Sequence, residues 1–162
     1  MLELYPTSAA LIGCYARPAA LDSLGPGGLP IRVAPNELLL VAAAAERGAA
    51  LEDARRALAA ADPGGLVFDL SAGFAIWTLA GDGRHEAYAR LCAIRPPEPP
   101  ACVQGLFAHV PAKIVVETER VHILVASTVG HHVRERVLGA CADLEPREGP
   151  EAPLAPAVGA PR

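Results

Sequence analysis

The 162-residue sequence has few aromatic residues and no long apolar run. Aromatic residues make up 4% of the chain and apolar residues 52%, so the core must be built mainly from aliphatic side chains. The longest unbroken apolar run, residues 38–45, is far shorter than the ~20 residues that a membrane-spanning helix needs. Residues 1–15 also lack the basic start of a secretory or transit peptide. We therefore expect no transmembrane helix and a cytoplasmic protein.

Positive charge and paired cysteines are also scarce. Lys113 is the single lysine beside 13 arginines, the net charge is −4 at pH 7, and no block of basic residues occurs. Nucleic acid is therefore not an expected partner, because binding to phosphates requires a basic surface. The cysteines are far apart and form no C-x-x-C pair, so we interpret them as small buried apolar residues. They are Cys14, Cys92, Cys102 and Cys141.

Motifs for nucleotide binding and nucleophilic catalysis are absent from the sequence. The segment Gly-Pro-Gly-Gly at residues 25–28 precedes a predicted strand and has no phosphate-binding pattern, so we interpret it as a loop. No G-x-S-x-G sequence occurs, and Asp69 and Asp82 do not have the spacing of an acid–base pair. Composition and spacing therefore predict no catalytic and no cofactor-binding residue in this chain.

One group of residues has the composition of a metal site. His131 and Glu135 lie four residues apart on a predicted helix, with His132 beside them. The H-E-x-x-H and H-x-x-E-H patterns are absent, however, and Arg134 and Arg136 would oppose a cation. We therefore predict no metal site and interpret these residues as a solvated helix face. The other histidines are isolated and are expected at the surface or at an interface: His85, His109 and His122.

Hydrophobic periodicity predicts alternating strands and helices. Strands are predicted at residues 9–15, 29–33, 37–41, 66–70, 74–80, 105–110, 113–118 and 120–126. Helices are predicted at residues 19–24, 49–61 and 84–92, and a last one, capped by Ser127 or Thr128, extends to about residue 144. Pro35 and Asn36 are typical of the turn of a β-hairpin. This order predicts an α+β fold with mainly antiparallel sheets and packed helices.

Two stretches are rich in proline. Residues 96–100 contain four prolines between ordered-looking segments, and we interpret them as a surface loop inside the fold. Residues 146–162 contain five more and no apolar period, which is typical of a disordered tail. We therefore expect one domain over residues 1–145, followed by this tail.

Six short segments occur in an informative order. They are IRVAPNELLL at 31–40, FDLS at 68–71, WTLAG at 77–81, LCAI at 91–94, LFAHVP at 106–111 and VHILVAS at 121–127. Together they resemble the γ subunit family of heterotetrameric sarcosine oxidase, and the likeness covers about residues 11–144. The resemblance implies two small α+β lobes with the fold of the glycine-cleavage T protein and its folate-binding relatives.

The resemblance also implies a function. The chain would be a non-catalytic accessory subunit of a flavoenzyme complex that oxidatively demethylates sarcosine or a related N-methyl amine. It would hold no cofactor itself, while the partner subunits hold FAD, FMN, NAD and zinc and pass the one-carbon unit to tetrahydrofolate. The implied partners are a larger α-type flavoprotein subunit and β- and δ-type subunits. Apolar surface for such a partner would make the isolated chain poorly soluble or oligomeric.

An alternative is a stand-alone folate-binding or aminomethyl-transfer protein of the same superfamily. In those relatives the corresponding strand pair carries an N-x-x-G-like turn and an acidic residue that faces the folate-borne group. Here residues 108–116 contain no Asn, no Gly and no carboxylate, and the first acidic residue is Glu117. This departure is evidence against folate chemistry. A third interpretation is an interaction module unconnected with amine oxidation.

Overall fold

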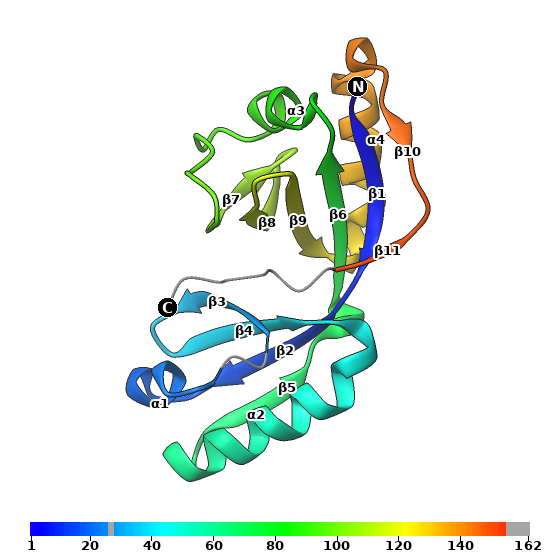
Figure 1. Ribbon diagram of the computed structural model, residues 1–162. Helices are drawn as coiled ribbons and strands as arrows, with labels where there is room; N and C mark the ends of the chain where they lie inside the picture. The colour runs from blue at the N-terminus through cyan, green and yellow to red at the C-terminus, as the bar shows by residue number, and fades with distance from the viewer. Residues whose placement is uncertain (26–27, 155–162) are drawn as a thin grey trace. The chain divides into compact units, whose positions relative to one another are not determined.

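The structure is a computed structural model that describes residues 1–25 and 28–154 (Figure 1). It divides into two compact units, of which the first comprises Met1–Thr7 and Gly73–Ala152. The second comprises Ser8–Ala72 together with residues 153–154. Residues 26–27 of the predicted glycine loop and residues 155–162 of the predicted tail lie outside the described residues. Within the described ranges, no helix is both long enough and apolar enough to cross a membrane.

The first unit is built on a mixed sheet of seven strands, in the order β10-β1-β6-β9-β8-β7 with β11 beside β1. The pairs from β1 to β7 along this order are antiparallel, whereas β10 runs parallel to β1. The strands are β1 (Glu3–Ser8), β6 (Phe74–Ala80), β7 (Ala101–Phe107), β8 (Val110–Val116), β9 (Arg120–Ala126), β10 (Arg147–Glu148) and β11 (Ala152–Pro153).

Two helices, α3 (Arg84–Leu91) and α4 (Gly130–Ala140), pack on one face of this sheet. Short 3₁₀ turns, η3 (Ser127–Val129) and η4 (Ala142–Leu144), flank α4. The Trp77 indole N–H donates to the Gly130 carbonyl at 2.8 Å and ties the start of α4 to β6. A Cβ atom at Gly130 would lie only 2.7 Å from that of Ala75, so glycine allows the helix to approach the strand closely.

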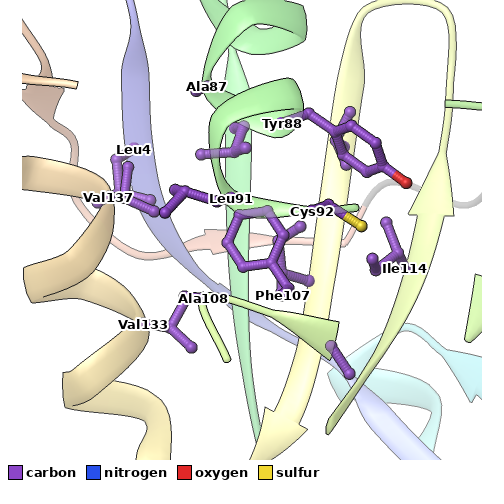
Figure 2. Packing of buried hydrophobic residues seen from close by; sticks show 14 of the residues in the cluster. Leu4, Ala87, Tyr88, Leu91, Cys92, Phe107, Ala108, Ile114, Val133 and Val137 are labelled. Carbon is purple, nitrogen blue, oxygen red and sulfur yellow. The ribbon is translucent and has the colours of Figure 1, made fainter. Parts of the chain in front are cut away.

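The core of the first unit lies between these helices and the sheet (Figure 2). Leu91 from α3 and Val137 from α4 point into it, and Phe107 reaches it from the end of β7. The rings of Tyr88 and Phe107 lie 6.4 Å apart in a tilted arrangement. Each buried aliphatic or aromatic side chain of this kind contributes about 1.5–3 kcal/mol, so a few such contacts stabilise the packing of both helices.

The second unit has a sheet of four antiparallel strands in the order β3-β4-β2-β5. Its elements are β2 (Ala10–Tyr15), α1 (Pro18–Asp22), β3 (Leu29–Ala34), β4 (Glu37–Ala42), η1 (Ala44–Glu46), α2 (Arg47–Ala61), β5 (Leu66–Asp69) and η2 (Ser71–Gly73). Helix α2 buries Ala50, Ala54 and Leu58 against one face of this sheet. It ends before Asp62, whose extended backbone is the conformation favoured before a proline.

The predicted α+β class and most predicted elements are confirmed, and Pro35 and Asn36 form the turn of the β3–β4 hairpin. The strand predicted at residues 105–110 is wrong, because β7 ends at Phe107 and β8 already begins at Val110. The turn between them is made by Ala108 and His109, which have φ values of 51° and 69°. Alanine is not typical of this left-handed backbone, and a single histidine is only a weak signal for it, so the sequence pattern does not reveal the turn.

Both ends of the predicted chain differ from the structure. Strand β1 was not predicted, and it pairs with β6 near the middle of the sheet. Inside the chain, the predicted helix cap is also wrong: Ser127 and Thr128 lie in η3, and α4 begins at Gly130 without a side-chain cap. In the predicted tail, β10 is ordered because its backbone pairs with β1, with hydrogen bonds of 2.9 Å to the carbonyls of residues 2 and 4.

Two glycines of the first unit provide a test of this backbone. Gly81 has φ +76°, and a Cβ atom there would lie 2.7 Å from the Met1 carbonyl oxygen. We expect Gly81→Ala to lower the free energy of unfolding by about 1–3 kcal/mol. Gly139 is an exposed position of α4 with nothing within 4 Å, so Gly139→Ala should raise it by about 0.5–1 kcal/mol. Urea denaturation measures both, and equal stability of the two variants would contradict the described turn.

Candidate functional site

A line of buried polar side chains crosses the sheet of the first unit. Thr7 in β1, Thr78 in β6 and His122 in β9 are 8%, 0% and 2% exposed. Thr78 lies directly opposite His122 in the β6–β9 register. Because side chains alternate along a strand, and Trp77 faces the helices, Thr78 and His122 belong to the sheet face turned away from α3 and α4.

These side chains form a continuous hydrogen-bonded relay. The hydroxyl oxygens of Thr7 and Thr78 are 2.5 Å apart, and the Thr78 hydroxyl is 2.7 Å from Nδ1 of His122. On the other side of the ring, Nε2 lies 3.4 Å from a carboxylate oxygen of Glu117, which is close but not aligned as an ordinary hydrogen bond. A carboxylate only accepts, so a proton on Nε2 leaves Nδ1 free to accept from Thr78.

The relay has the residue types of a catalytic triad, a hydroxyl, an imidazole and a carboxylate. A nucleophile must reach a substrate, however, and the Thr78 side chain is fully buried and already engaged by both Thr7 and His122. The relay stabilises the fold, because each of its side chains gives a hydrogen bond to a polar group that would otherwise be buried without one.

Glu117, just after β8, is the charged end of this relay. The ring N–H of His122, together with the charge of Arg120, lowers the pKa of Glu117 against the opposing effect of partial burial. The ionised carboxylate therefore stabilises the folded unit at neutral pH. This is the first acidic residue after the β7–β8 turn, and it faces His122 within the same unit.

A shallow groove of about 560 Å³ lies on the same face of the sheet. It crosses the ends of four strands and is lined by Gly73, Phe74, Gln104, Gly105, Leu106, Pro111, Ala112, Lys113, Leu124, Val125 and Ala126. Lys113 is half-buried, and its ammonium lies 5.3 Å from the centre of the Phe74 ring, as in a cation–π contact. The groove is thus mainly apolar, with Gln104 and Lys113 as its polar side chains.

The residues considered as metal ligands do not form a site. His131 and Glu135 are exposed, whereas Nε2 of His132 donates to the Ala108 carbonyl at 3.0 Å and holds the β7–β8 turn. Across residues 1–25 and 28–154, no group of three or more His, Cys, Asp or Glu side chains is placed to bind a metal ion. His85 and His109 are exposed, as predicted.

Two predictions about single residues are wrong. His122 is not at the surface, because the alternation of β9 turns it towards the relay rather than towards solvent. Cys102 is exposed, because it lies on the last strand of the sheet and faces away from the helices. Cys14, Cys92 and Cys141 are buried free thiols, as predicted.

Sequence reasoning missed both the relay and the groove. The relay joins residues up to 71 positions apart, and no local pattern links them. The groove had one signal in the sequence, the single lysine among many arginines.

The charged end of the relay predicts a pH dependence. The pKa of Glu117 is lowered from its ordinary value of 4.5, so its contribution is present above that value and is lost as the pH falls through the lower value in the folded protein. We expect Glu117→Gln to lower the free energy of unfolding at neutral pH by about 1 kcal/mol. The variant should also lose less stability than the wild type during acidification.

Urea denaturation at a series of pH values measures both effects. Glu119→Gln removes an exposed carboxylate from the same turn and is the matched control, with wild-type behaviour expected. Identical acid profiles for Glu117→Gln and the wild type would contradict the role of the carboxylate.

Comparison of the sequence with protein-family models gives no match, and neither does comparison with curated proteins. Solved structures, in contrast, are similar. Heterotetrameric sarcosine oxidase from Corynebacterium sp. U-96, in complex with pyrrole 2-carboxylate, contains a chain that matches with a TM-score of 0.75 and 21% identity. The match covers 91% of this chain and 87% of that chain.

Two further structures share the fold less completely. Glycine cleavage system aminomethyltransferase T from Bartonella henselae matches with a TM-score of 0.65 and 15% identity, over 91% of this chain. This chain spans about half of that protein, 47% of its length. The regulatory subunit of aspartate kinase from Thermus thermophilus, in its ligand-free form, matches with a TM-score of 0.52 and 14% identity, over 86% of this chain and 97% of that one.

The first two similarities agree with the resemblance that the short sequence segments indicate. At such low identity they show the fold alone. The chain has the α+β fold that is found in heterotetrameric sarcosine oxidase and in the glycine-cleavage T protein.

Proposed function

We propose that the chain is a non-catalytic, γ-type accessory subunit of a heterotetrameric flavoenzyme complex similar to sarcosine oxidase. In this proposal its partners are a larger α-type flavoprotein subunit and β- and δ-type subunits. Those partners hold FAD, FMN, NAD and zinc, transfer the one-carbon unit to tetrahydrofolate, and oxidise sarcosine or a related N-methyl amine in the cytoplasm.

The observation that supports this proposal is the extent of the structural match. The similarity to the sarcosine oxidase chain extends over 91% of this chain and 87% of the other, so the match includes most of both chains. The T protein, in contrast, has more than half of its length outside the match. A fold shared over most of one chain of a multi-subunit enzyme supports the same place for this protein in a related complex.

Exposed apolar side chains are consistent with a permanent neighbour. Leu66 and Phe68 on β5 are 55% and 48% exposed, and Leu106 on β7 is 56% exposed. Phe68 makes an edge-on contact with the half-buried Tyr15, with ring centres 5.9 Å apart, so one ring of this aromatic pair is exposed. Large apolar side chains of this kind stabilise protein interfaces when a partner covers them.

A folate-binding or aminomethyl-transfer protein is the competing function, because the T protein shares the fold. In such a protein an acidic residue near the β7–β8 hairpin would face the folate-borne group. Residues 108–116 have no carboxylate, and the first one after them, Glu117, faces the buried ring of His122. That arrangement favours the accessory role over folate chemistry.

Co-expression with candidate partner subunits tests the proposal. We expect a tagged form of the chain to co-purify with the α-, β- and δ-type subunits in equal amounts. We also expect omission of the chain to reduce the yield and thermal stability of the complex, because apolar surface of the α-type subunit would be left uncovered. The readouts are subunit stoichiometry and oxidation of sarcosine and other N-methyl amines.

The control is the same expression with an unrelated tagged protein in place of the chain. Recovery of the chain alone, together with a fully assembled and active complex in its absence, would refute the accessory role. Calorimetric titration of the isolated chain with tetrahydrofolate tests the competing function, and saturable binding would favour it.

A further inference from the structure

The single lysine of the chain lies in the groove on the first unit. Elsewhere the chain uses arginine for positive charge, with 13 arginines, so a lysine at this one place is unusual for this sequence. Lys113 projects from β8, where it is paired with Leu124 of β9, and its ammonium reaches across to Phe74 of β6. The charge is therefore held over the apolar floor of the groove.

Lys113 differs from the arginines in its electrostatic partners. Many of them pair with carboxylates, for example Arg90 with Asp143 and Arg134 with Glu148. Among residues 1–25 and 28–154, no carboxylate lies within ion-pair distance of the Lys113 ammonium, and no acidic residue lines the groove. Among the described residues, the charge of Lys113 therefore has no acidic partner, on a chain whose net charge is −4.

We propose that this groove binds an extended segment of the partner subunit that places an Asp or Glu carboxylate against the ammonium of Lys113. Apolar side chains of the same segment pack on Phe74 and Leu106. That this partner is the α-type subunit rests on the function proposed above. That the contact is an ion pair with apolar packing beside it follows from Lys113 and the apolar lining of the groove.

The form of the groove favours a segment of protein over a small ligand. The groove is open and crosses four adjacent strands, from Leu106 on β7 to Phe74 on β6, so it can support a chain that lies along it. Leu106 is 56% exposed and offers an apolar anchor at one end. An apolar contact beside one complementary charge is a common arrangement at protein interfaces, where the charge contributes specificity and association rate.

Affinity for the α-type subunit, measured with purified components, tests the groove directly. We expect Lys113→Glu to weaken binding at least about tenfold, since it opposes the carboxylate with a like charge. Lys113→Met keeps the apolar stem and removes the charge, and it should also weaken binding and reduce its dependence on salt. Lys113→Arg should retain most of the affinity.

Arg136→Glu is the matched control, because it reverses an exposed charge on α4, on the other face of the same sheet. Thermal unfolding of every variant checks that the first unit is intact, and Lys113→Met provides the test if Lys113→Glu does not fold. Leu106→Ser should weaken binding without changing its salt dependence.

The outcomes separate this proposal from the proposed function. If the wild-type chain does not bind the α-type subunit, the accessory role fails and the identity of the groove's partner fails with it. If the wild type binds and both Lys113→Glu and Lys113→Met bind equally well, the accessory role stands and the groove proposal is overturned. A homodimer of the isolated chain that Lys113→Glu dissociates would also overturn it, because the groove would then bind a second copy.

Discussion

Strand β6 pairs with β9 in a register that places Thr78 opposite His122 and Phe74 opposite Ala126. The polar relay depends on the first of these pairs, and the floor of the groove depends on the second. A shift of one residue would exchange the two faces of the strand, bringing Thr78 towards the helices and Trp77 away from them. The hydrogen bond from Trp77 to Gly130 would then be lost, and with it the anchor of α4.

One face of the sheet carries both the relay, whose polar groups bond to one another, and the groove, whose lysine has no carboxylate partner among the described residues. Thr7, Thr78 and His122 satisfy one another, so that part of the face is polar and yet has little capacity to bind anything else. Lys113 lies on the same face, with its ammonium over the Phe74 ring and without a carboxylate partner in the described part of the chain. The relay therefore stabilises the fold, whereas the ammonium of Lys113 is the charge to which we assign the proposed contact with a partner.

Sequence patterns predicted those elements whose signals are local. The β3–β4 hairpin follows from Pro35 and Asn36, and α2 follows from its helical spacing and the proline after Asp62. The β7–β8 turn could not be predicted, since Ala108 and His109 acquire their left-handed backbone from distant contacts. The Ala108 amide bonds to the carbonyl of residue 91, and its carbonyl accepts from the side chain of residue 132. His122 was misassigned for a similar reason, because only the folded register reveals its partners.

The path of the chain through the two units has a consequence for folding during synthesis. β1 leaves the ribosome before the second unit, and its partner β6 follows only after the whole of Ser8–Ala72. That intervening segment forms the second unit largely from its own contacts, so it can fold before the first sheet is complete. The pairing of Pro6 with Trp77 is a long-range contact that must close a large loop. Until then the exposed edge of β1 is a point at which a nascent chain could aggregate.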